Sequence, residues 1–169
     1  MVTHLIALNA TFDHLPDDTE ETRSGSSLRQ GAIVALATGL TLCGPRRGLP
    51  WFIGKQIKVI VPREGRRAPY MPSPDILVHP TLTNTSRTSL VLATDGMPAL
   101  VIEVASPSTA LTNDLNLTDE RGKPGVCEAI GVAEYLVFDP TAEFVPEQVW
   151  AWRRVAQGYA PWLPDERGR

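Results

Sequence analysis

The chemistry that this sequence could perform depends first on two carboxylates in apolar surroundings. Asp75 opens the stretch Asp75–Val78, and Glu103 lies inside the stretch Leu100–Ser106. Both stretches are short and rich in β-branched residues, which is typical of buried strands. A charge in a buried strand is costly unless it is paired or coordinates a cation. Two such carboxylates on strands that could lie side by side suggest a divalent metal ion between them. From the pattern alone, each could instead cap a loop or pair with an arginine.

Mg²⁺ would suit two such carboxylates because it takes oxygen ligands and keeps several waters. It typically binds one or two carboxylates together with phosphate oxygens. A site of this kind activates water and offsets the charge that develops on a phosphate during its displacement. Without the metal, two close carboxylates would repel each other and one would tend to hold a proton.

The elements that would position these residues can be predicted from periodicity and from turn residues. The pattern predicts a helix from about Thr19, or from a second start near Ser26, to about Leu42, where Gly44-Pro45 ends it. Pro124 begins a short helix that Gly131 closes. The predicted strands are 51–61, with Ile57, Val59 and Val61 on one face, then 75–79, 99–105 and 134–139, and a terminal hairpin of 148–155 and 158–162. This order predicts an α/β sandwich around a mixed sheet.

Composition limits the class of protein. At 169 residues with 43% hydrophobic content, the chain fits one domain, with 1–17 as a possible arm and 164–169 as a frayed tail. The net charge of −3 gives no basic footprint for charge-driven binding of nucleic acid, although a metal and a local patch could attract a phosphate backbone. That patch could be Lys55, Lys58, Arg63, Arg66 and Arg67, which could equally form a solvated hairpin. We expect no signal peptide, no membrane span and a cytoplasmic location.

Several segments resemble one known family. They are Pro74–Val78, Pro98–Thr109, Asp119 with Lys123, and Gly131–Pro140, in the family's order and at matching spacing. They resemble the Uma-type putative restriction endonuclease family of the PD-(D/E)XK nuclease superfamily. The resemblance is strong over 75–140 and weak toward both ends. It implies a restriction-endonuclease-like mixed β-sheet core flanked by helices, with the site at one sheet edge.

The resemblance also implies roles for individual residues. Asp75 and Glu103 would ligate the metal, and the backbone carbonyl of Val104 would be a further ligand. The usual lysine of the superfamily falls on Ala105 here, but the Uma-type pattern carries its lysine at the start of the next helix, where this chain has Lys123. Lys123 would orient the attacking water or stabilise the charge of the phosphate, or it is a solvated surface lysine. The chain departs from the family at Cys127, where a tyrosine is usual.

Other polar residues have weaker claims to a role. Asp114 and Asp119 could support the site from behind or start turns. Glu20 and Glu21 could supply an additional carboxylate to the metal site, or they could simply favour the start of a helix. Ser106 caps a loop, and His79 ends the strand that Asp75 opens.

Two functions are compatible with these residues. The first is a Mg²⁺- or Mn²⁺-dependent endonuclease acting on DNA, with Asp75, Glu103 and Lys123 as catalytic residues. The alternative is a catalytically inactive relative that serves as a nucleic-acid-binding or dimerisation module. A homodimer is expected in the first case because a duplex has two strands to cut and C₂ dimers are the commonest assembly.

Overall fold

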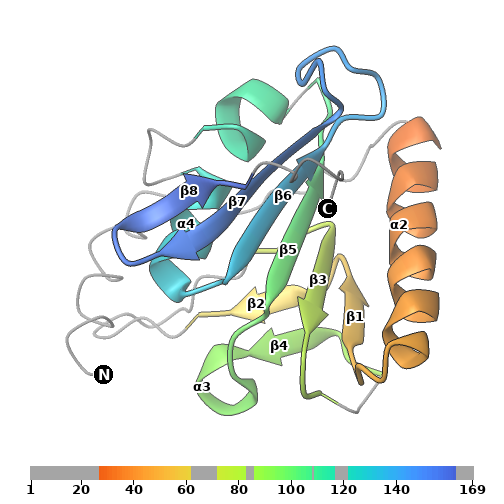
Figure 1. Ribbon diagram of the computed structural model, residues 1–169, viewed down its shortest axis with the longest axis vertical. Helices are drawn as coiled ribbons and strands as arrows, with labels where there is room; N and C mark the ends of the chain where they lie inside the picture. Colours follow the sequence, from red (N-terminus) through yellow and green to blue (C-terminus); the bar gives the residue numbers. More distant parts are fainter. Residues whose placement is uncertain (1–26, 62–71, 83–85, 108, 117–121, 163–169) are drawn as a thin grey trace.

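A six-stranded sheet forms the centre of the molecule (Figure 1). The computed structural model describes residues 27–61, 72–82, 86–107, 109–116 and 122–162. In spatial order the strands of the sheet are β1 (Phe52–Lys55), β3 (Ile76–His79), β5 (Leu100–Val104), β6 (Glu134–Phe138), β7 (Val149–Val155) and β8 (Gly158–Pro161). β5 and β6 run parallel, and the other neighbouring pairs are antiparallel. The mixed sheet flanked by helices that the sequence predicts is therefore confirmed.

Helices and a second, smaller sheet cover the two faces. α2 (Ser27–Arg46) packs on one face, where it shares a buried cluster with Ile102 and Val104 of β5. Side chains of a strand alternate between faces, so Val101 points the other way and joins the cluster beneath α4 (Lys123–Ile130). The parallel pair β2 (Lys58–Ile60) and β4 (Ser89–Val91) contributes to that second cluster.

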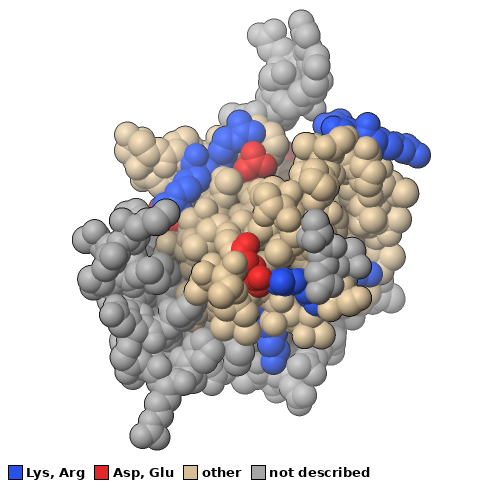
Figure 2. Space-filling model, turned by 90° about the horizontal axis from the view of Figure 1, so that it is seen from below, with Lys and Arg blue, Asp and Glu red and all other residues tan. Residues whose placement is uncertain are grey.

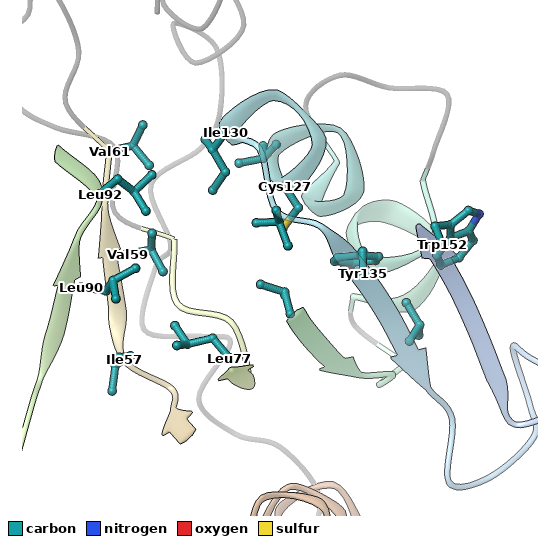
Figure 3. Close-up of a cluster of buried hydrophobic side chains, with 14 of the residues drawn as sticks. Ile57, Val59, Val61, Leu77, Leu90, Leu92, Cys127, Ile130, Tyr135 and Trp152 are labelled. Atoms are coloured by element: carbon teal, nitrogen blue, oxygen red, sulfur yellow. The ribbon is translucent and has the colours of Figure 1, made fainter. Parts of the chain in front are cut away.

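The larger core lies between the small sheet, α4 and the six-stranded sheet. Figure 3 shows Val59 and Leu90 of the small sheet on one side and Cys127 and Ile130 of α4 on the other. Tyr135 of β6 is fully buried and packs against Trp152 of β7. The alternating tryptophans near the carboxyl end thus contribute to a packed sheet face, with Trp150 remaining 40% exposed.

The stretch from Trp51 to Val61 does not form the single strand that its alternation predicts. It forms β1 and β2, which belong to different sheets, and Gln56 between them has a φ of 49°. Ile57 and Val59 are buried, as the pattern indicates. The alternation therefore identified the buried side chains correctly but could not show the turn between the two strands.

The remaining elements differ from the sequence prediction mainly at their ends. α2 continues to Arg46, beyond the predicted end near Leu42, and its last turn includes Pro45, which has no N–H to donate within the helix. α4 begins at Lys123 with Pro124 in its first turn and ends at Gly131, whose φ is 96°, as predicted. Two short helical segments that the sequence did not predict are α3 (Leu92–Asp95), which follows β4, and the π-helical turn η2 (Ala110–Asp114).

Parts of the prediction lie outside the described residues. These are the segment 19–26 at the start of the first helix, the arm 1–17 and the tail 164–169. Among the helices of the described ranges, none combines the length and apolar character that crossing a membrane requires.

Gly54 of β1 provides a test of how tightly β1 packs against Ile57, in the turn that follows it, and against Leu77 of the neighbouring strand β3. An added Cβ there would lie 2.7 Å from Ile57 Cδ1 and 3.2 Å from Leu77 Cγ. We expect Gly54→Ala to destabilise the protein by about 1–3 kcal/mol, the usual effect of overpacking a core. Urea unfolding measures this difference.

Gly39→Ala is the matched control, because nothing lies within 4 Å of the Cβ that it would add. This substitution in an exposed part of α2 should stabilise the protein by about 0.5–1 kcal/mol. Equal stabilities of the two variants would contradict the tight packing of Ile57 and Leu77 against Gly54.

Candidate active site

The two carboxylates predicted from the sequence lie next to each other at one end of adjacent strands. β3 and β5 pair antiparallel with Ile76 opposite Ile102, which brings Asp75 opposite Glu103. The Asp75 N–H donates to Glu103 Oε2 at 3.4 Å, and the Val104 N–H donates to Asp75 Oδ2 at 2.9 Å. Each acidic residue is only 1% exposed. The sheet therefore holds two acidic side chains together out of contact with water.

A lysine reaches the same place from the start of α4. Lys123 Nζ lies 2.9 Å from Glu103 Oε2 and 3.1 Å from Asp114 Oδ1. Gly122 caps the helix in an extended conformation, and Pro124 fixes its first turn. The side chain of Lys123 is 16% exposed. Of the two interpretations of Lys123, the solvated surface lysine is therefore wrong.

Asp114 is a third buried carboxylate of this cluster, and the sequence assigned it only a turn or a supporting role. It ends the π-helical turn η2 and is 1% exposed. Its Oδ2 accepts a hydrogen bond from the Thr109 hydroxyl at 2.5 Å, and its backbone carbonyl accepts one from the Tyr135 hydroxyl at 3.0 Å. The Ser106 and Thr109 hydroxyls are 2.9 Å apart, so Ser106 stabilises the loop, as expected. Asp114 is thus held firmly beside the lysine.

Arg29 of α2 completes the cluster, and sequence reasoning missed it. Its Nη2 lies 2.6 Å from Asp75 Oδ1, and its Nε donates to the carbonyl oxygen of Val104 at 3.2 Å. Arg29 is 7% exposed and stands one helical turn before the buried Ile33. Its place in the helix shows that it lies on the face that packs on the sheet, but the apolar residues of α2 are spread around the helix and the sequence does not mark that face.

The electrostatics of the cluster follow from three buried carboxylates that share two cations. Burial raises the pKa of Glu103 well above its ordinary value, and the charges of Asp75 and Asp114 act in the same direction, against Lys123. Burial alone would lower the pKa of Lys123, but the charges of Glu103, Asp114 and Asp75 outweigh it and raise that pKa. The sequence predicted that one carboxylate would tend to hold a proton because the two acids repel each other. For Glu103, burial contributes more to the raised pKa than the charges of the other acids do.

A small pocket with mostly apolar walls opens beside Glu103 and Lys123. Its lining includes Val59, Val101, Val126, Cys127 and Ile130. Burial raises the pKa of the Cys127 thiol, so this cysteine is not a thiolate nucleophile at neutral pH. Among the described residues, no three His, Cys, Asp or Glu side chains are grouped so that they could hold a metal ion.

The other candidate residues do not join the cluster or cannot be assessed. His79 is buried at the far end of β3, with a pKa lowered chiefly by burial. Asp139 is buried as well, but its carboxylate accepts hydrogen bonds from backbone N–H groups of the loop that follows it and stabilises that loop. Lys55 and Lys58 are exposed. Glu20, Glu21, Arg63, Arg66, Arg67 and Asp119 lie outside the described residues.

Charged side chains do not form a continuous basic surface on the face that Figure 2 shows. There, the acidic and basic side chains of the described residues lie in small mixed groups, and uncharged surface separates one group from the next. The possible phosphate-binding patch stays a prediction, because Arg63, Arg66 and Arg67 lie outside the described residues.

Comparison with known proteins identifies the family. The model of the Uma2 family, whose description is "Putative restriction endonuclease", matches residues 20–166. This chain belongs to that family. A solved structure described as a "putative nuclease belonging to DUF820", from Anabaena variabilis, has a similar fold, with a TM-score of 0.52 at 14% identity. The similarity covers 83% of this chain and 70% of that one. No curated protein matches the chain significantly.

The raised pKa of Glu103 has a consequence for stability that can be measured without metal. A carboxyl group whose pKa is raised by folding stabilises the folded state less as pH increases from its ordinary value of 4.5 toward the raised one. Replacing it by glutamine removes this dependence. In the presence of a chelator, Glu103→Gln should therefore gain stability relative to the parent protein as pH rises from 4.5 to neutrality.

The gain should be about 1.4 kcal/mol for each unit by which the pKa is raised. Denaturant unfolding across the pH range measures it. Glu143→Gln, at an exposed position, is the control and should show no such trend. A difference for Glu103→Gln that is independent of pH would contradict the raised pKa.

Proposed function

We propose that this protein is a divalent-metal-dependent endonuclease that hydrolyses phosphodiester bonds of DNA, with Mg²⁺ or Mn²⁺ as its cofactor. Membership of a family whose description is "Putative restriction endonuclease" supports the nuclease activity. The observation that carries the proposal is that Asp75 and Glu103 stand opposite each other on adjacent strands, both buried, and that Lys123 from a third segment contacts Glu103. A structural ion pair would need only two of them.

The donor chemistry at this point is compatible with such a metal. Asp75, Glu103 and the Val104 carbonyl offer oxygen ligands, which Mg²⁺ and Mn²⁺ prefer over nitrogen and sulfur. A bound divalent ion supplies Lewis acidity there, which lowers the pKa of water and offsets negative charge on a phosphate. The same oxygens contact Arg29 and Lys123 in the structure. Metal binding therefore requires a rearrangement of at least one of these cations.

Lys123 has the role of a fixed positive charge in this proposal. Its pKa is raised, so its ammonium group keeps its proton at neutral pH and is not a general base. It donates hydrogen bonds, and it can orient a water molecule or stabilise negative charge that develops on the phosphate. Asp114 also contacts the ammonium group, at 3.1 Å, and so helps to hold it beside Glu103.

The inactive module is the second candidate, and one observation favours it. Asp75 forms a close ion pair with Arg29, as an acid that no longer binds metal would be expected to do. The same fold would then serve DNA binding or dimerisation without catalysis. The two candidates differ in whether the purified protein binds a divalent ion and cuts DNA.

A cleavage assay with supercoiled DNA and Mg²⁺ or Mn²⁺ tests the nuclease. We expect nicking or linearisation by the parent protein, and none by the double variant Asp75→Asn, Glu103→Gln prepared identically, which controls for contaminating nucleases. Lys123→Met should lower the rate by about 10²–10³-fold, as the loss of one charge-stabilising donor typically does. Cleavage that persists in the double variant, or that is absent from the parent with either metal, would contradict the proposal.

We also propose that the active form is a homodimer, because two strands of a duplex require two sites. We further propose that the protein is located in the cytoplasm. Sedimentation velocity of the metal-free protein should give a mass twice that of the chain. A monomer that stays monomeric on a short DNA duplex would contradict this arrangement.

A further inference from the structure

Arg29 links α2 to the two backbone segments that form the site. Its guanidinium group contacts Asp75 Oδ1 at 2.6 Å through Nη2 and the Val104 carbonyl at 3.2 Å through Nε. Asp75 and Arg29 are both buried, with side chains 2% and 8% exposed. In the low dielectric of the interior this is a strong pairing, and it satisfies an acid that would otherwise be an uncompensated charge.

These two oxygen groups are the same ones that the proposed function assigns to the metal. A divalent ion of the Mg²⁺ type needs its oxygen ligands at about 2.0–2.1 Å in near-octahedral geometry. A guanidinium group that donates to the same carboxylate oxygen and to the same carbonyl occupies that space. The like charges of the two cations would also repel each other strongly in a buried site. Arg29 in this position and a metal on Asp75 and Val104 therefore exclude each other.

We propose that Arg29 is an internal counter-cation that competes with the divalent ion for Asp75 and the Val104 carbonyl, so that metal binds only when Arg29 withdraws. This inference rests on the proposed function, because that function assigns these two groups to the metal. It explains how the protein keeps Asp75 buried and folded without metal, and it makes Arg29 the residue that sets metal affinity.

Lys123 does not have this role, although it is the second cation of the cluster. Its ammonium group contacts Glu103 and Asp114, whereas the Asp75 carboxylate and the Val104 carbonyl are held by Arg29. Removal of Lys123 would free one ligand at most. Arg29 covers two of the three ligand groups, so its effect on metal affinity should be the larger one.

Calorimetric titration of Mn²⁺ into the parent protein and into Arg29→Gln tests the competition. We expect the dissociation constant to fall by about tenfold or more in the variant, since the metal no longer displaces a bound cation. The midpoint of thermal unfolding should be lower for the variant in chelator and should rise more on addition of Mn²⁺ than it does for the parent. Adding Asp75→Asn to the variant should abolish the tight binding.

Arg87→Gln is the matched control for the loss of an arginine–aspartate pair. Arg87 pairs with Asp95 at 2.5 Å, in an ion pair that includes none of the proposed metal ligands. This variant should change thermal stability without changing the affinity for Mn²⁺. A rise in affinity for Arg87→Gln equal to that for Arg29→Gln would overturn the inference, because the effect would then follow from loosened packing alone.

The outcomes separate this inference from the proposed function. If the parent binds Mn²⁺ and Arg29→Gln binds it equally or more weakly, Arg29 does not compete and only the inference fails. If neither protein binds Mn²⁺, with or without DNA, both fail. If only the variant binds, the inference is supported in its strongest form.

A second measurement follows the parent protein during metal titration and does not need Arg29→Gln to fold or to bind metal. The Nε–H group of Arg29 gives a nitrogen–proton NMR signal that is protected by its hydrogen bond to Val104, and Arg29→Lys identifies that signal by its loss. Saturating Mg²⁺ should shift the signal and speed its exchange with water. An unchanged Arg29 signal at metal saturation would overturn the inference.

Discussion

The structure depends on one constraint, which is that three carboxylates must be neutralised at the end of two buried strands. Asp75, Glu103 and Asp114 are each 1% exposed, and the effective dielectric there gives little screening. Two cations meet this requirement from opposite faces of the sheet: Arg29 from α2 and Lys123 from α4. The docking of both helices is thus tied to the charges of the site as well as to the apolar cores above and below the sheet.

The same constraint explains which parts of the site could be predicted from the sequence. Asp75 and Glu103 were identifiable because an acid in an apolar, β-branched run contradicts its surroundings. Lys123 was found through the family pattern and through Pro124 and Gly131, which delimit a short helix. Arg29 was not found, because the apolar residues of α2 are spread around the helix and do not mark one face as buried. Its partner stands 46 positions later in the chain, a separation that no local pattern reports.

The fold was predictable to a similar extent and for similar reasons. Core strands with continuous apolar runs and the short helix α4 were predicted nearly to the residue, whereas α2 continues past its predicted end. The prediction of a single strand from Trp51 to Val61 was wrong. The alternation of apolar and polar residues continues across the turn at Gln56, so the sequence pattern does not indicate that turn. The π-helical turn that carries Asp114 was also unpredictable, since it is held by hydrogen bonds to Thr109 and Tyr135 and not by propensity.

The parallel pairing of β5 and β6 has a consequence for how the protein folds. Parallel neighbours need a long crossover, and here residues 105–133 provide it. Asp114 and Lys123 both lie on that crossover, so pairing of β5 with β6 confines the chain that carries them to the neighbourhood of Glu103. The loop-closure entropy of this long-range strand pair, which slows folding, therefore also brings the lysine side of the cluster near its partners. A folding intermediate with β5 and β6 already paired would also have Lys123 close to Glu103.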